Sequence, residues 1–568
     1  MLKEYIVTLH NKEDLEDFYN DMETPGGDLY IPDRKVDLTL RRPISRNTHY
    51  MLTFEEAEQL KEDPRVWDVA PKDLIDAIEW KASGYSESGT WRRNASSFPI
   101  ASENNWGLYR HTETANPGGN WGQDSVSDKT ASFTITASGK NVDVLIVDGS
   151  IPYSANAHPE FAVNADGTGG TRVQYFNWFS LTNQLGLGSN GTYDYNTIGS
   201  ASDTDHGCHV AGTVAGNTLG WARDANIYSL EFYYANAVNQ VINSSPLTST
   251  TLWDYIREWH NTKPINPDTG RRNPTISNHS YGGSYTKDSL ITSGPYDGLG
   301  AMRYRGVITD EYNTNGSDLS DAQLEARGIN VPANGNWSVP AYSTAIEADV
   351  QDAQADGVIV VSAAGNSSQK ITLSGDQDYD NLGYLRSGTD YVAVFNTHRP
   401  DNAAGKTLSA TLIVGNLDDQ SNDRKRASSV CGNAVDIFAA GSGIVSSTLT
   451  TGNITDSRNG SYYLSKYNGT SMSSPQVTGV LALFAESNPN LTMSEAHDFI
   501  TSTATPNIMY DTGTDDCTDL ESLQGAANKI LYWKNQRPET GLSFPKINAK
   551  ARPSSGRTWP RPRMRVRG

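Results

Sequence analysis

The chain has 568 residues, of which 36% are hydrophobic and 20% charged, and its formal net charge is −20. This length allows one large domain with one or two small ones, and the acidic balance argues against general nucleic-acid binding. The sequence shows no run of 18 apolar residues and no recognisable secretory signal. We therefore expect no membrane span, and an intracellular or virion-associated protein rather than a secreted one.

Three cysteines occur in the chain: Cys208, Cys431 and Cys517. An odd and sparse set gives no disulfide framework, which favours a reducing compartment and leaves a single disulfide open.

Residues 1–81 predict a small α+β domain. The strand candidates are EYIVTLH, HYMLTF and RVWDVAPKD, and the helix candidates NKEDLEDFYNDM and FEEAEQLKEDP lie between them. Residues 82–105 are polar, rich in serine and without periodicity, so we expect a linker there.

Residues 106–535 predict an α/β domain with a mainly parallel sheet. Short apolar runs without clean alternation indicate strands buried on both faces, and the segments between them suit helices that cover both sides of the sheet. The runs are NVDVLIVD (141–148), ANIYSLEFY (225–233), TISNHSY (275–281), GVIVVSAAGN (357–366) and TLIVGN (411–416). In such sheets a site lies at the carboxyl ends of the strands. The polar stretch 295–345 is interpreted as surface insertions.

Residues 536–568 form a basic tail rich in proline and arginine. From residue 541 onward the tail contains eight Lys or Arg residues and no acid. We favour a disordered, solvated tail, and the alternative is an anchor for an acidic partner or for nucleic acid.

The stretch GTSMSSPQVTGVLALF places Ser471 at the start of a predicted helix. Its apolar residues have helical spacing, Gly469 allows an unusual backbone angle, and Pro475 lies in or just past the first turn. Free N–H groups and the helix dipole favour negative charge at such a place. An inert N-cap serine is the alternative.

A serine hydroxyl needs a neighbouring base to act as a nucleophile. In DTDHGCHVAGTVAG, His206 opens a helix candidate of small residues, and imidazole can accept and return a proton near neutral pH. Asp148 ends the apolar run VDVLIVD, where a carboxylate is costly unless it is paired, so it could orient the imidazole. The alternatives are metal binding by His206 and His209 as HxxH, surface histidines, and an ordinary Asp-Gly turn.

Asn366 ends the apolar run GVIVVSAAGN. Its side-chain amide could donate a hydrogen bond to an oxyanion, and an asparagine in a strand-to-loop turn is the alternative.

Together these four segments resemble the subtilisin-like serine proteases (subtilases). The order Asp, His, Asn, Ser along the chain agrees with that family. HGCHVAGTVAG resembles the family motif HGTHVAG, GTSMSSPQVTG resembles GTSMAxPHVAG, and VVSAAGN resembles the oxyanion strand. NHSYGG (278–283) resembles the strand that pairs with the substrate backbone, and HYMLTFEEAEQLKEDPRVWDVAPK resembles the inhibitor-like propeptide.

The resemblance implies a subtilisin-like α/β fold and a serine endopeptidase made as a self-processing zymogen. The implied site residues are Asp148, His206 and Ser471 for catalysis, Asn366 for the oxyanion, and Ser280, Tyr281 and Gly282 for substrate binding. Residues 1–81 would be a ferredoxin-like propeptide that acts as an intramolecular inhibitor, and 82–105 would contain the processing site. The implied partners are protein or peptide substrates, with no membrane and with nucleic acid only through the tail.

The resemblance implies no cofactor for the chemistry, whereas structural calcium is common in the family. Asp376, Asp378 and Asp380 are weak calcium candidates because they are spaced like a calcium loop but lack the glycine and distal glutamate of an EF-hand. A solvated turn is the favoured role for this stretch.

Some residues depart from the family motifs without removing a catalytic group. Cys208 replaces Thr beside the base, which suggests sensitivity to thiol reagents, Gln476 replaces His, and Ser473 replaces Ala. Two rival functions stay open: a structural or binding protein on a subtilase scaffold, such as a virion component, and a metal-dependent hydrolase that uses His206 and His209.

Overall fold

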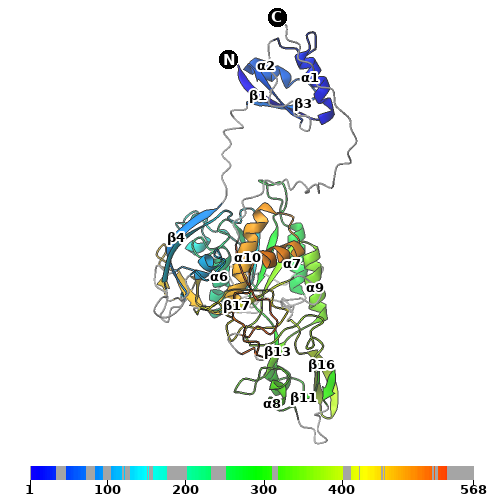
Figure 1. The fold of residues 1–568 in the computed structure, drawn as a ribbon, viewed down its shortest axis with the longest axis vertical. Helices are drawn as coiled ribbons and strands as arrows, with labels where there is room; N and C mark the ends of the chain where they lie inside the picture. Colours follow the sequence, from blue (N-terminus) through cyan, green and yellow to red (C-terminus); the bar gives the residue numbers. More distant parts are fainter. Residues whose placement is uncertain are drawn as a thin grey trace, which may run out of the picture. The chain divides into compact units, whose positions relative to one another are not determined.

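The computed structural model divides into two compact units, Met1–Ala82 (unit 1) and Ser83–Gly568 (unit 2) (Figure 1). The residues it describes are 2–32, 46–71, 84–93, 104–117, 121, 128–149, 151, 158–175, 201–231, 251–309, 318–400, 411–420, 422–449, 452, 454–514, 517–518 and 522–533. The predicted tail, 536–568, lies outside the described residues. Within the described ranges, no helix is both long and apolar enough to cross a membrane.

Unit 1 is a three-stranded antiparallel sheet packed against two helices. The strand order is β2-β1-β3, and Phe18, Tyr50 and Leu52 lie in a separate apolar core. The elements are β1 (Lys3–Leu9), η1 (Lys12–Asp14), α1 (Leu15–Glu23), β2 (Asn47–Leu52), α2 (Phe54–Leu60) and β3 (Val66–Pro71). Alternating burial along β1 gives this sheet one face on the core, and the predicted strands and helices are confirmed.

Unit 2 is built on a nine-stranded sheet with the order β22-β23-β18-β17-β14-β9-β6-β8-β7. Its strands are β6 (Asp143–Asp148), β7 (Val173–Tyr175), β8 (Asn226–Glu231), β9 (Thr275–His279), β14 (Val358–Ala363), β17 (Leu412–Leu417), β18 (Ile437–Ala440), β22 (Thr505–Pro506) and β23 (Lys529–Ile530). Only the pair β22–β23 is antiparallel among the ladders of this sheet that the structure describes. The five predicted apolar runs are the neighbouring strands β17, β14, β9, β6 and β8, which confirms the predicted parallel sheet.

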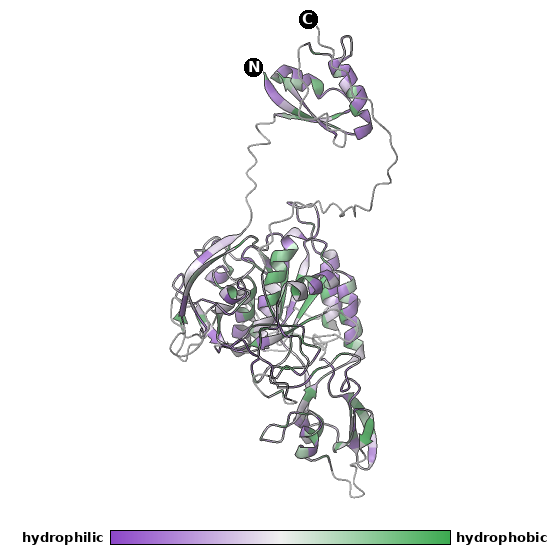
Figure 2. Ribbon diagram, viewed as in Figure 1, coloured by the Kyte–Doolittle hydropathy of each residue, from purple (hydrophilic) through white to green (hydrophobic). Residues whose placement is uncertain are grey.

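Helices and strands enclose the sheet so that every residue of β6, β9 and β14 is buried. The helices are α4 (Trp106–Arg110), η2 (Pro159–Phe161), α6 (Ala201–Ala215), α7 (Thr251–Thr262), α9 (Thr344–Ala355), α10 (Thr470–Ser487) and α11 (Met493–Thr503). α7 packs on α9, α6 packs on α10, and both α9 and α10 contact β14. Figure 2 shows the apolar character of α10, whose residues are almost all buried.

A small sheet, β19-β21-β20, lies against α6 through β19. Its strands are β19 (Ile444–Thr448), β20 (Ile454–Thr455) and β21 (Tyr463–Tyr467).

The predicted surface insertion, 295–345, is part of a satellite with a core of its own, which also includes elements within 284–292 and 382–396. A four-stranded antiparallel sheet, β12-β11-β15-β16, and the pair β10–β13 enclose Met302, Leu324 and Trp337. The elements are β10 (Ser284–Thr286), η3 (Asp288–Thr292), β11 (Gly298–Tyr304), β12 (Val307–Thr309), α8 (Asp321–Glu325), β13 (Ser338–Pro340), β15 (Leu382–Ser387) and β16 (Asp390–Asn396). Figure 1 shows these elements grouped at one end of unit 2.

The predicted linker 82–105 is wrong for its described residues. β4 (Tyr85–Arg92) pairs along its length with β5 (Asp128–Ile135), and Trp91 is buried against aromatic rings of the core. Arg93 is fully buried, forms an ion pair with Asp423 at 2.9 Å and lies over the Trp106 ring at 4.7 Å. A polar ribbon held by two buried anchors, Trp91 and Arg93, carries little apolar signal, so its sequence resembles that of a linker.

Candidate active site

Neighbouring parallel strands bring the predicted site residues to one edge of the sheet. On β6 and β9, Val147 is opposite His279, and on β9 and β14, His279 is opposite Ser362. Asp148 therefore ends β6 beside the residue that follows β9, Ser280. The segment that carries Asn366 leaves β14 at the same edge. This is the carboxyl end of the strands, where sites of open α/β sheets form.

Asp148 and His206 form a hydrogen-bonded pair. The Asp148 carboxylate is fully buried, and its Oδ1 lies 2.7 Å from His206 Nδ1 and accepts from the Gly149 N–H at 2.7 Å. Because a carboxylate only accepts, Nδ1 carries the proton, which leaves Nε2 as the basic nitrogen of the imidazole. The His206 side chain is 29% exposed, so the buried acid orients a partly accessible base.

Close packing brings α6 to the end of β6. A Cβ atom on Gly207 would collide with the carbonyl oxygen of Gly149, so only glycine allows this approach. The helix begins at Ala201, so His206 lies in its second turn and not in the predicted opening position.

Ser471 lies in the first turn of α10, as predicted. The helix begins at Thr470, and the preceding Gly469 has φ +149°, a conformation that favours glycine. Ser471 is 9% exposed, and its hydroxyl donates to the carbonyl oxygen of Ser280 at 2.9 Å. Ser471 thus meets the strand end beside Asp148.

Pro475 lies in the second turn of α10 and changes the hydrogen bonding of the Ser471 carbonyl. Proline has no N–H, so the Ser471 carbonyl lacks its usual partner four residues on. The Ser280 hydroxyl donates to that carbonyl at 2.9 Å and also contacts the Ser474 hydroxyl at 2.9 Å. Ser280 therefore contacts Ser471 twice, through its hydroxyl and through its carbonyl, and the predicted substrate-binding residue also supports the helix start.

Asn366 is exposed and lies over the beginning of α10. Its Oδ1 accepts from the Thr470 N–H at 2.9 Å and from the Thr470 hydroxyl at 3.1 Å. These bonds fix the amide so that Nδ2 is its remaining donor, and Nδ2 lies 3.3 Å from the position of a Cβ on Gly469. The Thr470 hydroxyl also accepts from the Gly365 N–H at 3.1 Å. Sequence reasoning missed Thr470, although its place beside Ser471 was a signal.

Tyr281 and Gly282 continue from Ser280 toward solvent. The Tyr281 hydroxyl lies 2.9 Å from His279 Nδ1, and Gly282 is exposed. The chain thus reaches the surface at Tyr281 and Gly282, directly after the buried Ser280 that contacts Ser471.

His209 does not share a metal site with His206. Its Nε2 lies 2.9 Å from the Ile444 carbonyl, its ring stacks on Tyr467, and burial lowers its pKa to about 3. Among the residues that the structure describes, no three His, Cys, Asp or Glu side chains are grouped as metal ligands.

The calcium candidates pair with cationic side chains. Asp378 forms ion pairs with Arg305 and Lys370 at 2.8 and 2.7 Å. Although burial opposes its ionisation, these two cations hold the pKa of Asp378 well below its usual range. Asp380 is paired with Arg399 at 3.0 Å, and the Asp376 carboxylate accepts from the backbone N–H of Asp378 at 2.9 Å.

The departures from the family motifs at Cys208 and Gln476 are both buried. Burial raises the pKa of the Cys208 thiol, and the side chain is fully enclosed, so a thiol reagent cannot reach a thiolate there. The burial of Cys208 disfavours the reagent sensitivity that the sequence suggests. Gln476 accepts from the Trp221 indole N–H at 2.6 Å and donates to Asn105 at 3.0 Å, which satisfies the amide in the core.

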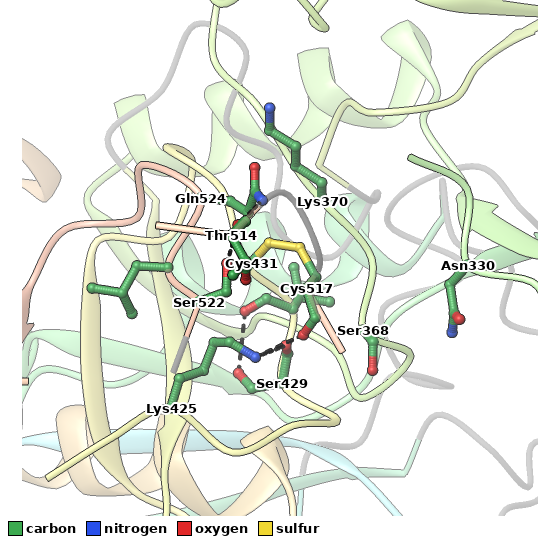
Figure 3. Close-up of a disulfide and its surroundings, with 12 residues drawn as sticks. Asn330, Ser368, Lys370, Lys425, Ser429, Cys431, Thr514, Cys517, Ser522 and Gln524 are labelled. Atoms are coloured by element: carbon green, nitrogen blue, oxygen red, sulfur yellow. Dashed lines mark hydrogen bonds between the residues drawn. A yellow bond between two sulfur atoms is a disulfide. The ribbon is translucent and has the colours of Figure 1, made fainter. Parts of the chain in front are cut away.

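A disulfide joins Cys431 and Cys517, so the open possibility of one bridge is realised (Figure 3). The Cα atoms are 5.7 Å apart, a normal span for a disulfide. Beside it, the buried Lys425 ammonium donates to the carbonyl oxygens of Cys517 and Arg426 at 2.8 and 3.0 Å. Cys431 also exchanges backbone hydrogen bonds with the segment after Asn366, through the Cys431 N–H to Gln369 at 3.0 Å. The disulfide thus supports one side of the candidate site.

Comparisons with known proteins identify the family of this chain. The model of the subtilase family matches residues 139–527, more than half of the chain. The extracellular serine proteinase of Thermus sp. (strain Rt41A) is 25% identical over 399 residues, which cover 69% of this chain and 63% of that protein. Subtilisin DY of Bacillus licheniformis is 31% identical over 166 residues, which cover 29% of this chain and 46% of that protein.

A solved structure, the crystal structure of a cold adapted subtilisin-like serine proteinase, matches with a TM-score of 0.41 and 20% identity. The match covers 76% of this chain and 98% of that one. The matches to the Thermus proteinase and to subtilisin DY each span less than two thirds of those proteins. The family match and the order of the strands and motifs lead to one conclusion: this chain belongs to the subtilase family.

Proposed function

We propose that the protein is a serine endopeptidase that hydrolyses peptide bonds of protein substrates. The observation that carries the proposal is the 2.7 Å contact between the buried Asp148 carboxylate and His206 Nδ1. This pair lies at the edge of the sheet that the start of α10, with Ser471, also meets. A serine nucleophile needs a base that a buried carboxylate orients.

In this mechanism Ser471 Oγ attacks the peptide carbonyl while His206 Nε2 takes its proton. The same imidazole then gives the proton to the leaving amine, and Asp148 holds the tautomer and stabilises the imidazolium. Water then attacks the acyl-enzyme while His206 takes its proton, and His206 returns that proton to Ser471 Oγ as the acid product leaves. Each proton transfer uses side chains of the chain itself.

The developing oxyanion would be held by the Asn366 amide and the Ser471 backbone N–H. The Asn366 oxygen is already bonded to Thr470, so its Nδ2 is oriented before substrate arrives. A donor fixed in advance needs no reorganisation in the transition state, which is why such groups contribute strongly to the rate.

The test compares Ser471→Ala with Ser473→Ala, the same change two residues further along α10. We expect Ser471→Ala to lose casein cleavage and fluorophosphonate labelling, with a loss near the roughly 10⁶ known for subtilisin, a family member. Ser473→Ala, at a buried position outside the machinery, should keep both. Equal cleavage by Ser471→Ala and wild type would refute the proposal, and absent labelling of wild type would favour a non-catalytic scaffold.

We further propose that unit 1 is an inhibitory leader removed by self-cleavage, consistent with its autonomous core. The pairing of β4 restricts where that cut can fall, because Tyr85–Arg92 and the buried Arg93 belong to the packed part of unit 2. Ser471→Ala protein should stay full length, whereas wild type shortens from the N-terminus. If wild type cleaves casein while it stays full length, the zymogen proposal fails and the peptidase proposal stands.

A further inference from the structure

A pocket of about 580 Å³ lies within the satellite, and its volume is in the range of ligand sites. Its described lining residues fall in two ranges. Residues 304–307 surround the turn between β11 and β12, and residues 322–327 belong to α8 and the chain just after it. The candidate catalytic and substrate-binding residues are not among them, so this pocket is separate from the candidate active site.

One part of the lining is apolar and open to solvent. It consists of the Tyr304 side chain, Val307, and the methyl groups of Ala322 and Ala326 on α8. Val307 is 62% exposed, and the next residue, Ile308, is 53% exposed. Large aliphatic side chains that stand exposed at a pocket mark a surface that binds an apolar group.

The charged part of the lining is cationic. Two of the described lining residues are arginines, Arg305 and Arg327, and none of the described lining residues is acidic. Arg327 is 8% exposed, and its Nη1 donates to the Gln323 carbonyl. A guanidinium has five N–H donors, so this bond orients the group without exhausting its donors. The chain as a whole has a net charge of −20, so the lining differs in sign from the molecule and favours an acidic occupant.

Arg305 forms the rim of the pocket in an unusual backbone conformation. It has φ +49° in the turn that continues through Gly306 at φ +82°, where asparagine, aspartate and glycine are the usual residues. The Arg305 N–H donates to Asn381 Oδ1 at 2.7 Å, and its guanidinium pairs with Asp378 at 2.8 Å. The rim is therefore fixed before any ligand arrives, and an arginine retained in a disfavoured conformation points to a functional position.

We infer that this pocket is an exosite, a site apart from the cleaved bond, that binds an acidic side chain and its apolar neighbour in a protein substrate. The inference rests on the proposed peptidase function. Arg327 binds the carboxylate in a charge-assisted hydrogen bond, and Tyr304 and Val307 contact the apolar neighbour. Because these contacts are the same before and during bond cleavage, they lower KM and leave kcat unchanged.

The first measurement is binding to the full chain with Ser471→Ala, followed by fluorescence anisotropy. The probes are two labelled decapeptides, one of alternating Glu and Leu and one of alternating Gln and Leu. We expect the Glu peptide to bind at least about tenfold more tightly, the scale of a hydrogen bond to a charged group. Arg327→Gln should abolish this preference. Ala322→Phe should abolish it too, because it fills the pocket from an exposed position.

The matched control is Arg303→Gln, which removes the same charge from β11. Arg303 lies outside the pocket lining and donates to the Asp380 carbonyl at 2.9 Å, so this variant should keep the preference for the Glu peptide. The second measurement uses chains with Ser471 intact. Arg327→Gln should raise KM for casein, an acidic protein, by about tenfold with kcat unchanged. It should leave kcat/KM unchanged for a short neutral peptide, which does not reach the exosite.

Thermal melts establish that each variant is folded. Equal binding of the two decapeptides, a preference that survives Arg327→Gln, or an unchanged KM for casein overturns the inference, while cleavage of casein by wild type upholds the peptidase function. If Arg327→Gln does not fold, Ala322→Phe decides by the same criteria. If wild type cleaves neither substrate faster than Ser471→Ala, the proposed function is overturned and the exosite with it.

Discussion

His111 must stay neutral in the folded protein, and this predicts a pH-dependent loss of stability. The ring is fully buried, with Nδ1 2.8 Å from the Leu531 carbonyl and with Nε2 accepting from the Ala440 N–H at 2.9 Å. Protonation of Nε2 would break the second bond. Burial, and next the Arg110 guanidinium, lowers the pKa of His111 from 6.5 to about 3.

The magnitude follows from linkage between the two pKa values. In the unfolded chain the ring binds a proton near pH 6.5, so unfolding takes up a proton at any pH between the two values. The stabilisation is fully present above pH 6.5 and falls as the pH falls toward the folded pKa. Between pH 7.5 and pH 5 the expected loss of unfolding free energy from this one residue is about 2 kcal/mol.

The assay is urea unfolding at pH 7.5 and pH 5 in a Ser471→Ala background, which prevents self-digestion. Adding His111→Gln keeps a donor and an acceptor but removes the titration, so the drop between the two pH values should shrink by about 2 kcal/mol. Adding His10→Gln instead, at an exposed ring in unit 1, should leave the drop as it was. The reasoning fails if His111→Gln and its parent show the same pH dependence.

Three further outcomes are expected. Asn366→Ala should lower kcat by roughly 10²–10³, the cost of losing the equivalent amide in subtilisin, a member of this family, while retaining activity above Ser471→Ala in a casein assay. N-terminal sequencing and mass spectrometry of the processed protein should find Tyr85–Arg92 retained with unit 2, and its release would contradict the role given to β4. Replacing Cys431 and Cys517 together by serine should lower the unfolding free energy by about 4.6 kcal/mol in the chain-entropy account, given their separation of 86 residues, and an unchanged urea midpoint would refute this.

The sequence predicted the centre of the sheet and indicated a candidate site for identifiable reasons. Strands such as β6 and β14 are buried on both faces, so they appear as nearly continuous apolar runs. Asp148 ends such a strand, Asn366 follows one, and Ser471 lies at the start of an apolar helix, which is why the sequence singles them out. The structure brings Asp148 to His206 and Asn366 to the residue before Ser471.

The features that sequence reasoning missed depend on contacts between distant segments. β4 is mostly a half-exposed ribbon, and its two strong anchors, Trp91 and Arg93, are recognisable only with their partners in place. Ser280 can donate to the Ser471 carbonyl because Pro475 has no N–H to bond to it. Pro475 lies 195 residues after Ser280 in the chain, so no local pattern shows this contact. The cysteine pairing was equally invisible, because spacing alone does not choose among three thiols.

The insertion grows out of loops that follow β9 and β14 and leaves both strands in register. The nine-stranded scaffold can therefore keep Asp148, His206 and Ser471 fixed while the added elements lengthen, shorten or diverge. For the proposed peptidase, preference among substrates and competence for bond cleavage can thus evolve separately within one polypeptide.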